Sequence, residues 1–211
     1  ISEIGDDSLW LRYDALLCAD ERARQARFRF ARDQRRYLVT RALVRSALSR
    51  YAAVRPEEWA FSAGAHGRPA ISGPRPVPAL EFNISHSADL VMLGVTSGRM
   101  LGIDVENFEA RDADIAGLDR YFAPPESAAL LSLAPRERRR RFFELWTLKE
   151  SYIKARGMGL AIALDAFRFE LTGERGLTLH MHPELGDSPE RWRLWQLALR
   201  PDRKSTRLNS S

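Results

Sequence analysis

Residues 142–160 read FFELWTLKESYIKARGMGL, and the fold can be worked out from this stretch outward. It predicts the second half of a long helix running from about residue 136 to 156, and Gly157 is the residue type that ends helices. Four aromatic side chains lie on this helix: Phe142, Phe143, Trp146 and Tyr152. Such a helix should be largely buried, with the rest of the chain packed around it.

Two charged residues of this helix, Glu150 and Lys154, are four apart and therefore share a face. Taken alone, such a pair is the commonest surface ion pair and contributes only a few tenths of a kcal/mol. A buried charge, in contrast, needs a partner such as a metal ion or a phosphate. Lysine is also scarce here, because only three of the 33 cationic residues are lysines, Lys149, Lys154 and Lys204.

Upstream, residues 102–107 read GIDVEN and predict a strand. Asp104 and Glu106 then project from one face with Cα atoms roughly 6.5 Å apart, so both carboxylates can converge on one cation. Oxygen ligands of this kind select Mg²⁺ or Mn²⁺ rather than zinc. A solvated strand face is the simpler interpretation of a bare Asp-x-Glu pattern, and it stays open at this point.

Further upstream, residues 82–87 read FNISHS. Ser85 and His86 are adjacent, so on an extended segment they point apart and make a poor nucleophile–base pair. No G-x-S-x-G turn is present either, which argues against a hydrolase triad. His86 fits better as a donor to a phosphate, with Ser85 hydrogen-bonding nearby, although a structural histidine remains an alternative.

The positive charge of the chain is concentrated in one block. The net charge is +5, yet residues 22–50 hold ten arginines and one acidic residue, a local charge of +9. Such a block indicates either a phosphate-bearing partner or a solvated basic helix.

Composition excludes several classes of protein. The chain has 211 residues, 45% of them hydrophobic and 29% charged, which is typical of a globular protein. One cysteine, Cys18, rules out a disulfide scaffold and a zinc site built on Cys pairs. There is no membrane-spanning apolar run and no signal-peptide pattern at the start, so we expect a cytoplasmic protein with no membrane partner.

The pattern predicts an α+β fold in which each half is a helix followed by short strands. A basic helix capped by Asp20 runs to Tyr51, and a short helix starts at Pro125. Strands are predicted at 59–62, 81–85, 90–97, 100–107, 166–171, 177–182 and 192–199. Segments 90–97 and 100–107 should form a hairpin that turns at Ser97 and Gly98. Residues 202–211 lack periodicity and are expected to be a disordered or non-native tail.

Five segments in this order resemble the 4′-phosphopantetheinyl transferases, specifically the larger two-lobed Sfp-type branch. They are FARDQRRYLVTRALVR at 30–45, GRP at 67–69, FNISHS at 82–87, GIDVE at 102–106 and FFELWTLKESYIKARGMGL at 142–160. The resemblance extends over residues 19–169. It implies two similar α/β lobes in a pseudo-twofold arrangement, each a helix on a small, mainly antiparallel sheet. The N-terminal lobe would span 1–99 on the nucleotide side of coenzyme A, and the C-terminal lobe 100–201 on the metal and pyrophosphate side.

The resemblance also implies an activity. The enzyme would transfer 4′-phosphopantetheine from coenzyme A to a serine of an apo acyl or peptidyl carrier protein, with Mg²⁺ as cofactor and Mn²⁺ as an alternative, and release 3′,5′-ADP. Asp104, Glu106 and Glu150 match the metal ligands, and Lys154 matches the lysine on the pyrophosphate. Glu150 is also the candidate base for the serine proton.

Basic and polar positions around the nucleotide match Arg24, Arg36, Arg68, Ser85 and His86. The turn Gly67-Arg68-Pro69 resembles the family's turn against the adenine, although lysine is commoner where Arg68 stands. Glu126 matches another acidic position of the family, and Lys149 is a weaker candidate to assist; neither has an assigned role. We expect a monomer, because two lobes in one chain already form the cleft.

Two other functions compete with this one. A metal-dependent nuclease or phosphodiesterase would use the same carboxylates and lysine, but would leave FNISHS and GRP without a role. A nucleic-acid-binding module would use the arginine block by counterion release but would leave Asp104 and Glu106 unexplained. We therefore expect no nucleic-acid partner.

Overall fold

The structure is a computed structural model, and it describes residues 1, 4, 6–64, 66–76, 79–88, 90–107, 115–172 and 176–197, with only the backbone at 115, 116, 119 and 160. The predicted tail at 202–211 lies outside the described residues. None of the described helices is long and apolar enough to cross a membrane.

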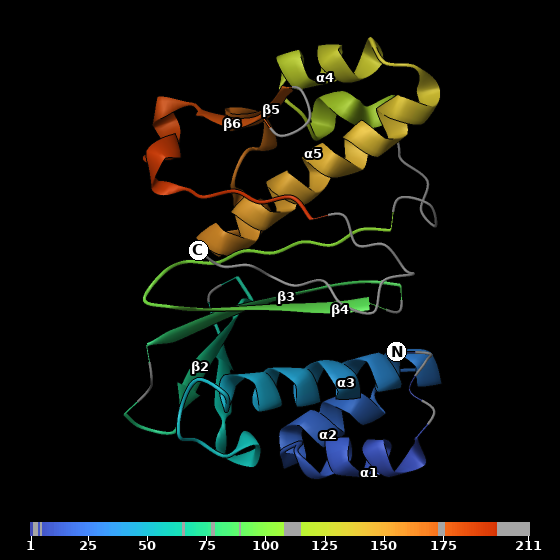
Figure 1. Ribbon diagram of the computed structural model, residues 1–211, viewed down its shortest axis with the longest axis vertical. Helices are drawn as coiled ribbons and strands as arrows, with labels where there is room; N and C mark the ends of the chain where they lie inside the picture. The colour runs from blue at the N-terminus through green and yellow to red at the C-terminus, as the bar shows by residue number, and fades with distance from the viewer. Residues whose placement is uncertain are drawn as a thin grey trace.

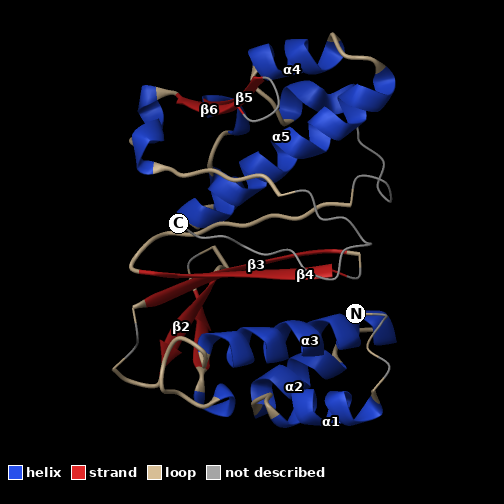
Figure 2. Cartoon of the chain, viewed as in Figure 1, coloured by secondary structure: helices blue, strands red, loops and turns tan. Residues whose placement is uncertain are grey.

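The first half of the chain contains three helices and two small antiparallel sheets (Figures 1 and 2). The helices are α1 (Asp7–Ala15), α2 (Ala19–Ala26) and α3 (Ala31–Leu48). Strands β1 (Ala60–Ala63) and β2 (Pro69–Gly73) form one sheet, and β3 (Leu80–Ser87) and β4 (Leu90–Ser97) form the other. Val44 and Leu48 of α3 pack with Trp59 and Phe82 to form the core of this half.

The second half also combines helices with a small antiparallel sheet, but it has one long helix and a single sheet. Helices α4 (Pro124–Leu131) and α5 (Pro135–Arg156) precede the antiparallel strands β5 (Phe167–Thr172) and β6 (Gly176–Met181). Short 3₁₀ turns lie at Pro56–Glu58 in the first half and, in the second half, at Ile115–Arg120, Gly159–Ala161, Leu164–Ala166, Pro183–Leu185 and Pro189–Arg191. The aromatic residues of α5 pack into a core with β5 and β6, as expected of a buried helix.

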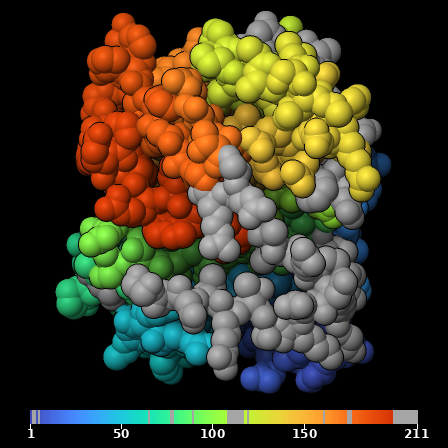
Figure 3. All heavy atoms as spheres, turned by 45° about the horizontal axis from the view of Figure 1, so that its top comes forward, coloured from blue at the N-terminus to red at the C-terminus, as the bar shows by residue number. Residues whose placement is uncertain are grey.

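The two halves stack with their helices and sheets in layers. Figure 1 shows α1–α3 at one end, then β3 and β4, then α5, with α4, β5 and β6 at the other end. In the space-filling view of Figure 3, the green residues of the chain's middle lie between the blue-cyan first half and the yellow-orange second half. The predicted α+β fold of two lobes, each a helix on a small antiparallel sheet, is confirmed. The lobe boundary between residues 99 and 100 stays a prediction.

The predicted basic helix is two helices rather than one. It breaks at residues 27–30, where the Gln34 amide donates to the carbonyl of Phe28 across the gap. Asp20 is not the cap, because α2 begins at Ala19 and the backbone N–H of Cys18 donates to the Glu21 carboxylate, 3.1 Å away. A carboxylate in the first turn thus satisfies an N–H that would otherwise be unpaired.

The predicted hairpin of 90–97 with 100–107 is wrong. Strand β4 pairs with β3, from Leu90 opposite Ser87 to Ser97 opposite Leu80, and residues 101–107 are extended without belonging to a sheet. Two alternating segments can each satisfy a strand pattern, and only the tertiary pairing decides which of them form a ladder.

A strand is also absent at residues 192–197, so the prediction of 192–199 as a strand is wrong for the residues that the structure describes. The Trp192 indole donates to the Asp187 carboxylate at 3.0 Å, and the Gln196 amide donates to the Glu144 carbonyl at 2.9 Å. These side-chain contacts hold the segment along α5 rather than beside β6.

Candidate active site between the two lobes

Residues 101–107 follow strand β3 through side-chain hydrogen bonds instead of a backbone ladder. The N–H groups of Ile103, Val105 and Asn107 donate to Asn83 Oδ1, Ser85 Oγ and Ser87 Oγ, at 3.0, 3.3 and 3.0 Å. Because side chains alternate along a strand, these three short polar residues share one face of β3. Every second N–H of the crossing segment therefore finds an acceptor, and the segment is held in one register.

The other side of the crossing segment lies directly against α5. A side chain at Gly102 would collide with the backbone of Ser151 and Ala155 on that helix. The close approach requires glycine, because only a residue without a Cβ allows two backbones to come this near. The segment that carries Asp104 and Glu106 is thus enclosed between β3 of the first lobe and α5 of the second.

Asp104, Ser85 and Lys154 form a hydrogen-bonded cluster at this junction. The Lys154 ammonium lies 2.6 Å from Asp104 Oδ1 and 3.1 Å from Ser85 Oγ, and the Ser85 hydroxyl donates to the same Asp104 oxygen at 2.8 Å. The Asp104 side chain is only 6% exposed, and its second oxygen, Oδ2, is buried without a hydrogen-bond partner among the described residues. Such an orphaned carboxylate oxygen is costly to bury and is ready to accept a ligand.

The other predicted metal ligands lie near this cluster but do not complete it. Ser87 donates to Glu106 at 3.1 Å, and Glu150 lines the same cavity as Lys154. Within the part of the chain that the structure describes, no group of three carboxylate, histidine or cysteine side chains is close enough to hold a metal ion. The geometry therefore supplies the buried oxygen of Asp104 as one donor, with Glu106 and Glu150 on neighbouring elements.

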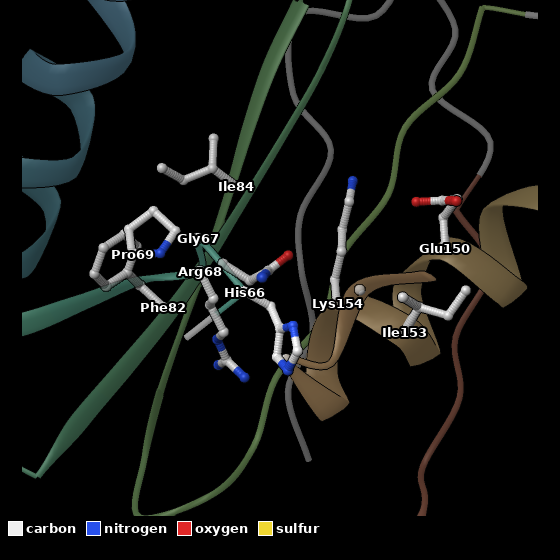
Figure 4. Close-up of a pocket in the computed structure, with 12 residues that line it drawn as sticks. His66, Gly67, Arg68, Pro69, Phe82, Ile84, Glu150, Ile153 and Lys154 are labelled. Atoms are coloured by element: carbon white, nitrogen blue, oxygen red, sulfur yellow. The ribbon is translucent and has the colours of Figure 1, made fainter. Parts of the chain in front are cut away.

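A cavity of about 430 Å³ opens beside the cluster. Its walls include the apolar side chains of Pro69, Phe82, Ile84 and Ile153, and its polar groups come from both lobes. The polar and charged lining residues are His66, Arg68, Asn83, Glu150 and Lys154. In Figure 4, Pro69 and Phe82 lie on one side, His66 and Arg68 in the middle, and Lys154 and Glu150 on the other. An apolar slot with a few convergent polar groups is typical of a small-molecule site.

Arg68 joins the two lobes across this cavity. Its guanidinium donates to the carbonyls of Ala155 at 2.7 Å and Leu101 at 3.4 Å, and it pairs with Glu81 of β3 at 3.2 Å. The Ala155 carbonyl belongs to the last turn of α5, where carbonyls lack helical partners and cations are favoured. The residue expected to bind nucleotide is thus already bonded to the protein.

The other predicted nucleotide contacts are not in the lining of this cavity. Arg24 is exposed on α2 with its guanidinium 6.0 Å from the centre of the Tyr37 ring, and Arg36 on α3 pairs with Asp33 at 2.8 Å. His86 is exposed on β3 and, as expected, points away from Ser85. Of the five, the structure brings Arg68 and Ser85 to the junction of the lobes and leaves Arg24, Arg36 and His86 outside it.

Glu126 and Lys149 form a buried ion pair away from the cavity. Their charged atoms are 2.8 Å apart, and the Lys149 side chain is fully buried. The ammonium also donates to the carbonyls of Leu164 and Phe167, and the carboxylate accepts the N–H groups of Ala123 and Phe169. Burial lowers the pKa of Lys149, and the Glu126 carboxylate opposes that shift. With all these partners inside the second lobe, the pair links α4, α5 and β5 rather than touching substrate.

Part of the arginine block is structural as well. Arg41 and Arg45 are buried and share the Glu21 carboxylate, with Arg41 Nε at 2.6 Å and Arg45 Nη2 at 2.8 Å. The Arg45 guanidinium also donates to the carbonyls of Pro56 and Trp59. Two of the ten arginines therefore connect α2, α3 and the start of β1, and are not available to a phosphate-bearing partner.

Sequence reasoning missed four contributors to this site: Asn83, Ser87, Gly102 and His66. Asn83 and Ser87 are signalled by the alternation of small polar residues with apolar ones in FNISHS. Gly102 is the first residue of the quoted GIDVE and His66 directly precedes GRP, but nothing in the sequence reveals that Gly102 touches a helix or that His66 lines a cavity.

Comparison with known protein families identifies the class to which this fold and this site belong. A model described as 4′-phosphopantetheinyl transferase superfamily matches residues 100–206, and one described as 4′-phosphopantetheinyl transferase, N-terminal, matches residues 6–97. The chain belongs to the 4′-phosphopantetheinyl transferase superfamily and is an enzyme of the Sfp type. The predicted family and transferase activity are confirmed, and nothing in these comparisons supports a nuclease or a nucleic-acid-binding module.

Individual relatives agree. The chain is 34% identical over 162 residues to the 4′-phosphopantetheinyl transferase psf-1 of Bacillus pumilus, covering 77% of this chain and 67% of that one. It is 35% identical over 170 residues to HetI of Nostoc sp., covering 80% and 71%. It is 34% identical over 160 residues to Sfp of Bacillus subtilis, covering 76% and 69%.

Proposed function

We propose that this transferase moves the 4′-phosphopantetheine group from coenzyme A to a serine of an apo acyl or peptidyl carrier protein. The serine oxygen would bond to the β-phosphorus of coenzyme A as the bond from that phosphorus to the bridging oxygen breaks. The products would be the phosphopantetheinylated carrier and 3′,5′-ADP. The observation that carries this proposal is the Lys154–Asp104–Ser85 cluster beside an apolar-walled cavity lined from both lobes.

Asp104, Glu106 and Glu150 would hold the Mg²⁺ ion, and Mn²⁺ suits the same oxygen donors. The buried, unpartnered Oδ2 of Asp104 supports this assignment, because it is a hard anionic donor with no protein partner among the described residues. Because the described residues bring fewer than three such ligands close together, water and substrate oxygens would complete the shell, as is usual for Mg²⁺. When bound, the ion would neutralise negative charge on the pyrophosphate.

Lys154 would bind the pyrophosphate. Its side chain is 28% exposed and lines the cavity, whereas the Asp104 side chain that it contacts is nearly buried. A lysine held at one side by Asp104 and Ser85 can still present N–H donors to phosphate oxygens. Such fixed positive charge is the dominant requirement of phosphoryl transfer, since negative charge develops on the leaving group.

Glu150 would accept the proton of the carrier serine. It lies one helical turn before Lys154 on the same face of α5 and lines the same cavity. A base in that position would act beside the pyrophosphate that Lys154 binds. Glu150 would therefore be both a metal ligand and the candidate base.

The nucleotide of coenzyme A would lie in the apolar part of the cavity, against Pro69 and Phe82 of the first lobe. Arg68 and Ser85 would contribute from the lobe junction, Ser85 chiefly by orienting Asp104 and Lys154. Contacts from Arg24, Arg36 and His86 remain proposals for parts of the substrate outside the cavity.

The remaining proposals concern the partners, the oligomeric state and the cellular location of the enzyme. An acidic carrier protein would be attracted by the exposed arginines of a chain with net charge +5. We expect the enzyme to act as a monomer in the cytoplasm, with no nucleic-acid partner.

The test is intact-mass spectrometry of an apo carrier protein incubated with this enzyme, coenzyme A and Mg²⁺. A gain of the phosphopantetheine mass that disappears with EDTA and returns with added Mg²⁺ is expected. No mass gain on several carriers, from folded enzyme, would overturn the proposal, and cleavage of nucleic acid by the same preparation would then favour the phosphodiesterase.

A further inference from the structure

His66 lines the substrate cavity but belongs to none of the motifs that point to the function. It lies in the turn between β1 and β2, and its ring lies between Arg68 and the end of α5 in Figure 4. It lies close to the turn after α5, because a Cβ added to Gly159 would lie 4.0 Å from His66 Cβ. None of the described residues hydrogen-bonds its ring.

The arginine and the lysine that line the cavity are already bonded to the protein. Arg68 donates to Ala155 and Leu101 and pairs with Glu81, and Lys154 pairs with Asp104 and Ser85. Because no described residue accepts a hydrogen bond from the His66 ring, its N–H donor is available to substrate.

We infer that His66 is a further substrate-binding residue, which donates a hydrogen bond from its ring to a phosphate of coenzyme A. The inference rests on the proposed function. Coenzyme A offers two phosphates of the same chemistry, the 3′-phosphate of its ribose and the pyrophosphate. Either is a strong acceptor, and a hydrogen bond to a charged acceptor contributes more to binding than one to a neutral group.

The test compares His66→Ala, His66→Gln and His66→Phe, with His182→Ala as the matched control. His182 is an exposed histidine that follows β6 and is not among the lining residues of the cavity. For each variant, KM and kcat are measured with coenzyme A and with 3′-dephospho-coenzyme A, and the Kd for coenzyme A is measured by calorimetry.

For His66→Ala we expect a KM and a Kd for coenzyme A raised about 5- to 10-fold with kcat nearly unchanged. His66→Gln keeps an N–H donor and should recover part of the loss. His66→Phe keeps a ring without a donor and should behave like His66→Ala. If the contact is to the 3′-phosphate, the loss disappears with 3′-dephospho-coenzyme A; if it is to the pyrophosphate, the loss persists.

Two results would overturn the inference: an unchanged KM and Kd in His66→Ala, or wild-type binding by His66→Phe, which would mean that the ring only stacks. Failure of the proposed function is distinguishable, because the wild-type enzyme would then transfer nothing to carriers. The calorimetric Kd for coenzyme A would still report on His66 in that case.

Discussion

Asp104 combines three structural features in one residue. Its Oδ1 accepts hydrogen bonds from Lys154 and Ser85, its Oδ2 is buried without a partner among the described residues, and its backbone belongs to the segment enclosed by both lobes. The negative charge of Asp104 therefore holds the Lys154 ammonium through Oδ1 and can bind a cation through Oδ2.

Replacing Asp104 by Asn keeps the shape and removes the charge. We expect the rate of carrier modification to fall by about 10²-fold or more, because Lys154 and the metal ion both lose their anionic partner. The measurement is the initial rate of the mass gain, with thermal unfolding as the check on folding. Glu184→Gln, an exposed side chain after β6, is the control and should leave the rate unchanged. A folded Asp104→Asn enzyme with near wild-type rate would contradict the assignment.

Arg68 is the second residue whose role depends on its partners. Because it bonds the carbonyls of Leu101 and Ala155, it positions the segments that carry Asp104 and Lys154. For Arg68→Met we expect a larger fall in kcat than rise in KM for coenzyme A, with partial recovery in Arg68→Lys, which can satisfy fewer carbonyls. Steady-state kinetics of each variant measures kcat and the KM for coenzyme A separately. If Arg68→Met changes only KM, Arg68 is a simple nucleotide contact and not a positioning residue. The matched control is Arg55→Met, because Arg55 is an exposed arginine paired with Glu57 and Glu58.

At the scale of elements, the crossing segment depends on one glycine. Gly102→Ala would place a methyl group against the backbone of α5, so either the helix or the segment must move. We expect a loss of about 3 kcal/mol or more in the free energy of unfolding, together with loss of activity. Gly64→Ala is the control, because its added Cβ would meet its nearest neighbour, the Arg68 carbonyl, at an ordinary 3.5 Å. Equal stability of the two variants in urea unfolding would mean that the segment does not lie against α5.

The buried pair of Glu126 and Lys149 links α4, α5 and β5, and its two charges should be strongly coupled. Lys149→Met leaves a buried carboxylate without its cation and should cost about 3–5 kcal/mol of stability. Glu126→Gln/Lys149→Met removes both charges, so its cost should be well below the sum of the two single variants. Denaturant unfolding of all four proteins gives this coupling energy. Additive costs would show that the pair is not a unit.

The stability that the contact between α2 and α3 contributes should depend on pH. Burial alone would raise the pKa of Glu21, but the charge of Arg41, a backbone hydrogen bond from Cys18 and the charge of Arg45 outweigh it and lower the pKa below its ordinary value of 4.5. A carboxyl group with a lowered pKa in the folded protein adds stability above its unfolded pKa, and that stability is lost as pH falls toward the folded pKa.

Below about pH 4.5, Glu21→Gln should therefore lose less stability on acidification than the wild-type enzyme does. Glu137→Gln, an exposed residue in the first turn of α5, should follow the wild-type curve. Unfolding curves at several pH values between 3 and 7 measure the difference, and parallel curves for all three proteins would contradict the role of Glu21.

For the whole molecule, the active site exists only where the two lobes meet. β3 supplies Asn83, Ser85 and Ser87, α5 supplies Glu150 and Lys154, and residues 101–107 lie between them. Each lobe has its own core, so each can bury its apolar residues separately, but neither holds a complete site. Catalysis should therefore be more sensitive than core stability to changes at the junction.

The residue pattern predicted an α+β fold and the buried helix ended by Gly157, and the resemblance of the ordered motifs to the transferase family implied the two lobes. The sequence also singled out Asp104, Lys154 and Ser85, which the structure brings into one cluster. These features depend on periodicity and on ordered motifs, both of which are local. The hairpin of 90–97 with 100–107, the strand at 192–197 and the single basic helix were wrong, because an alternating or periodic pattern does not say which partner it meets.

Only the tertiary structure decided which charged residues are available to a ligand. Arg41, Arg45 and Lys149 are as cationic in sequence as Lys154, yet the first three are buried with their carboxylate partners, whereas Lys154 is partly exposed and lines the cavity. Likewise, only the folded structure shows that the Arg68 guanidinium is bonded to protein carbonyls and that the ring of His66 beside it lines the cavity. A side chain's chemistry is set by its residue type, but its availability is set by distant segments that pack against it, and only the folded chain brings those segments together.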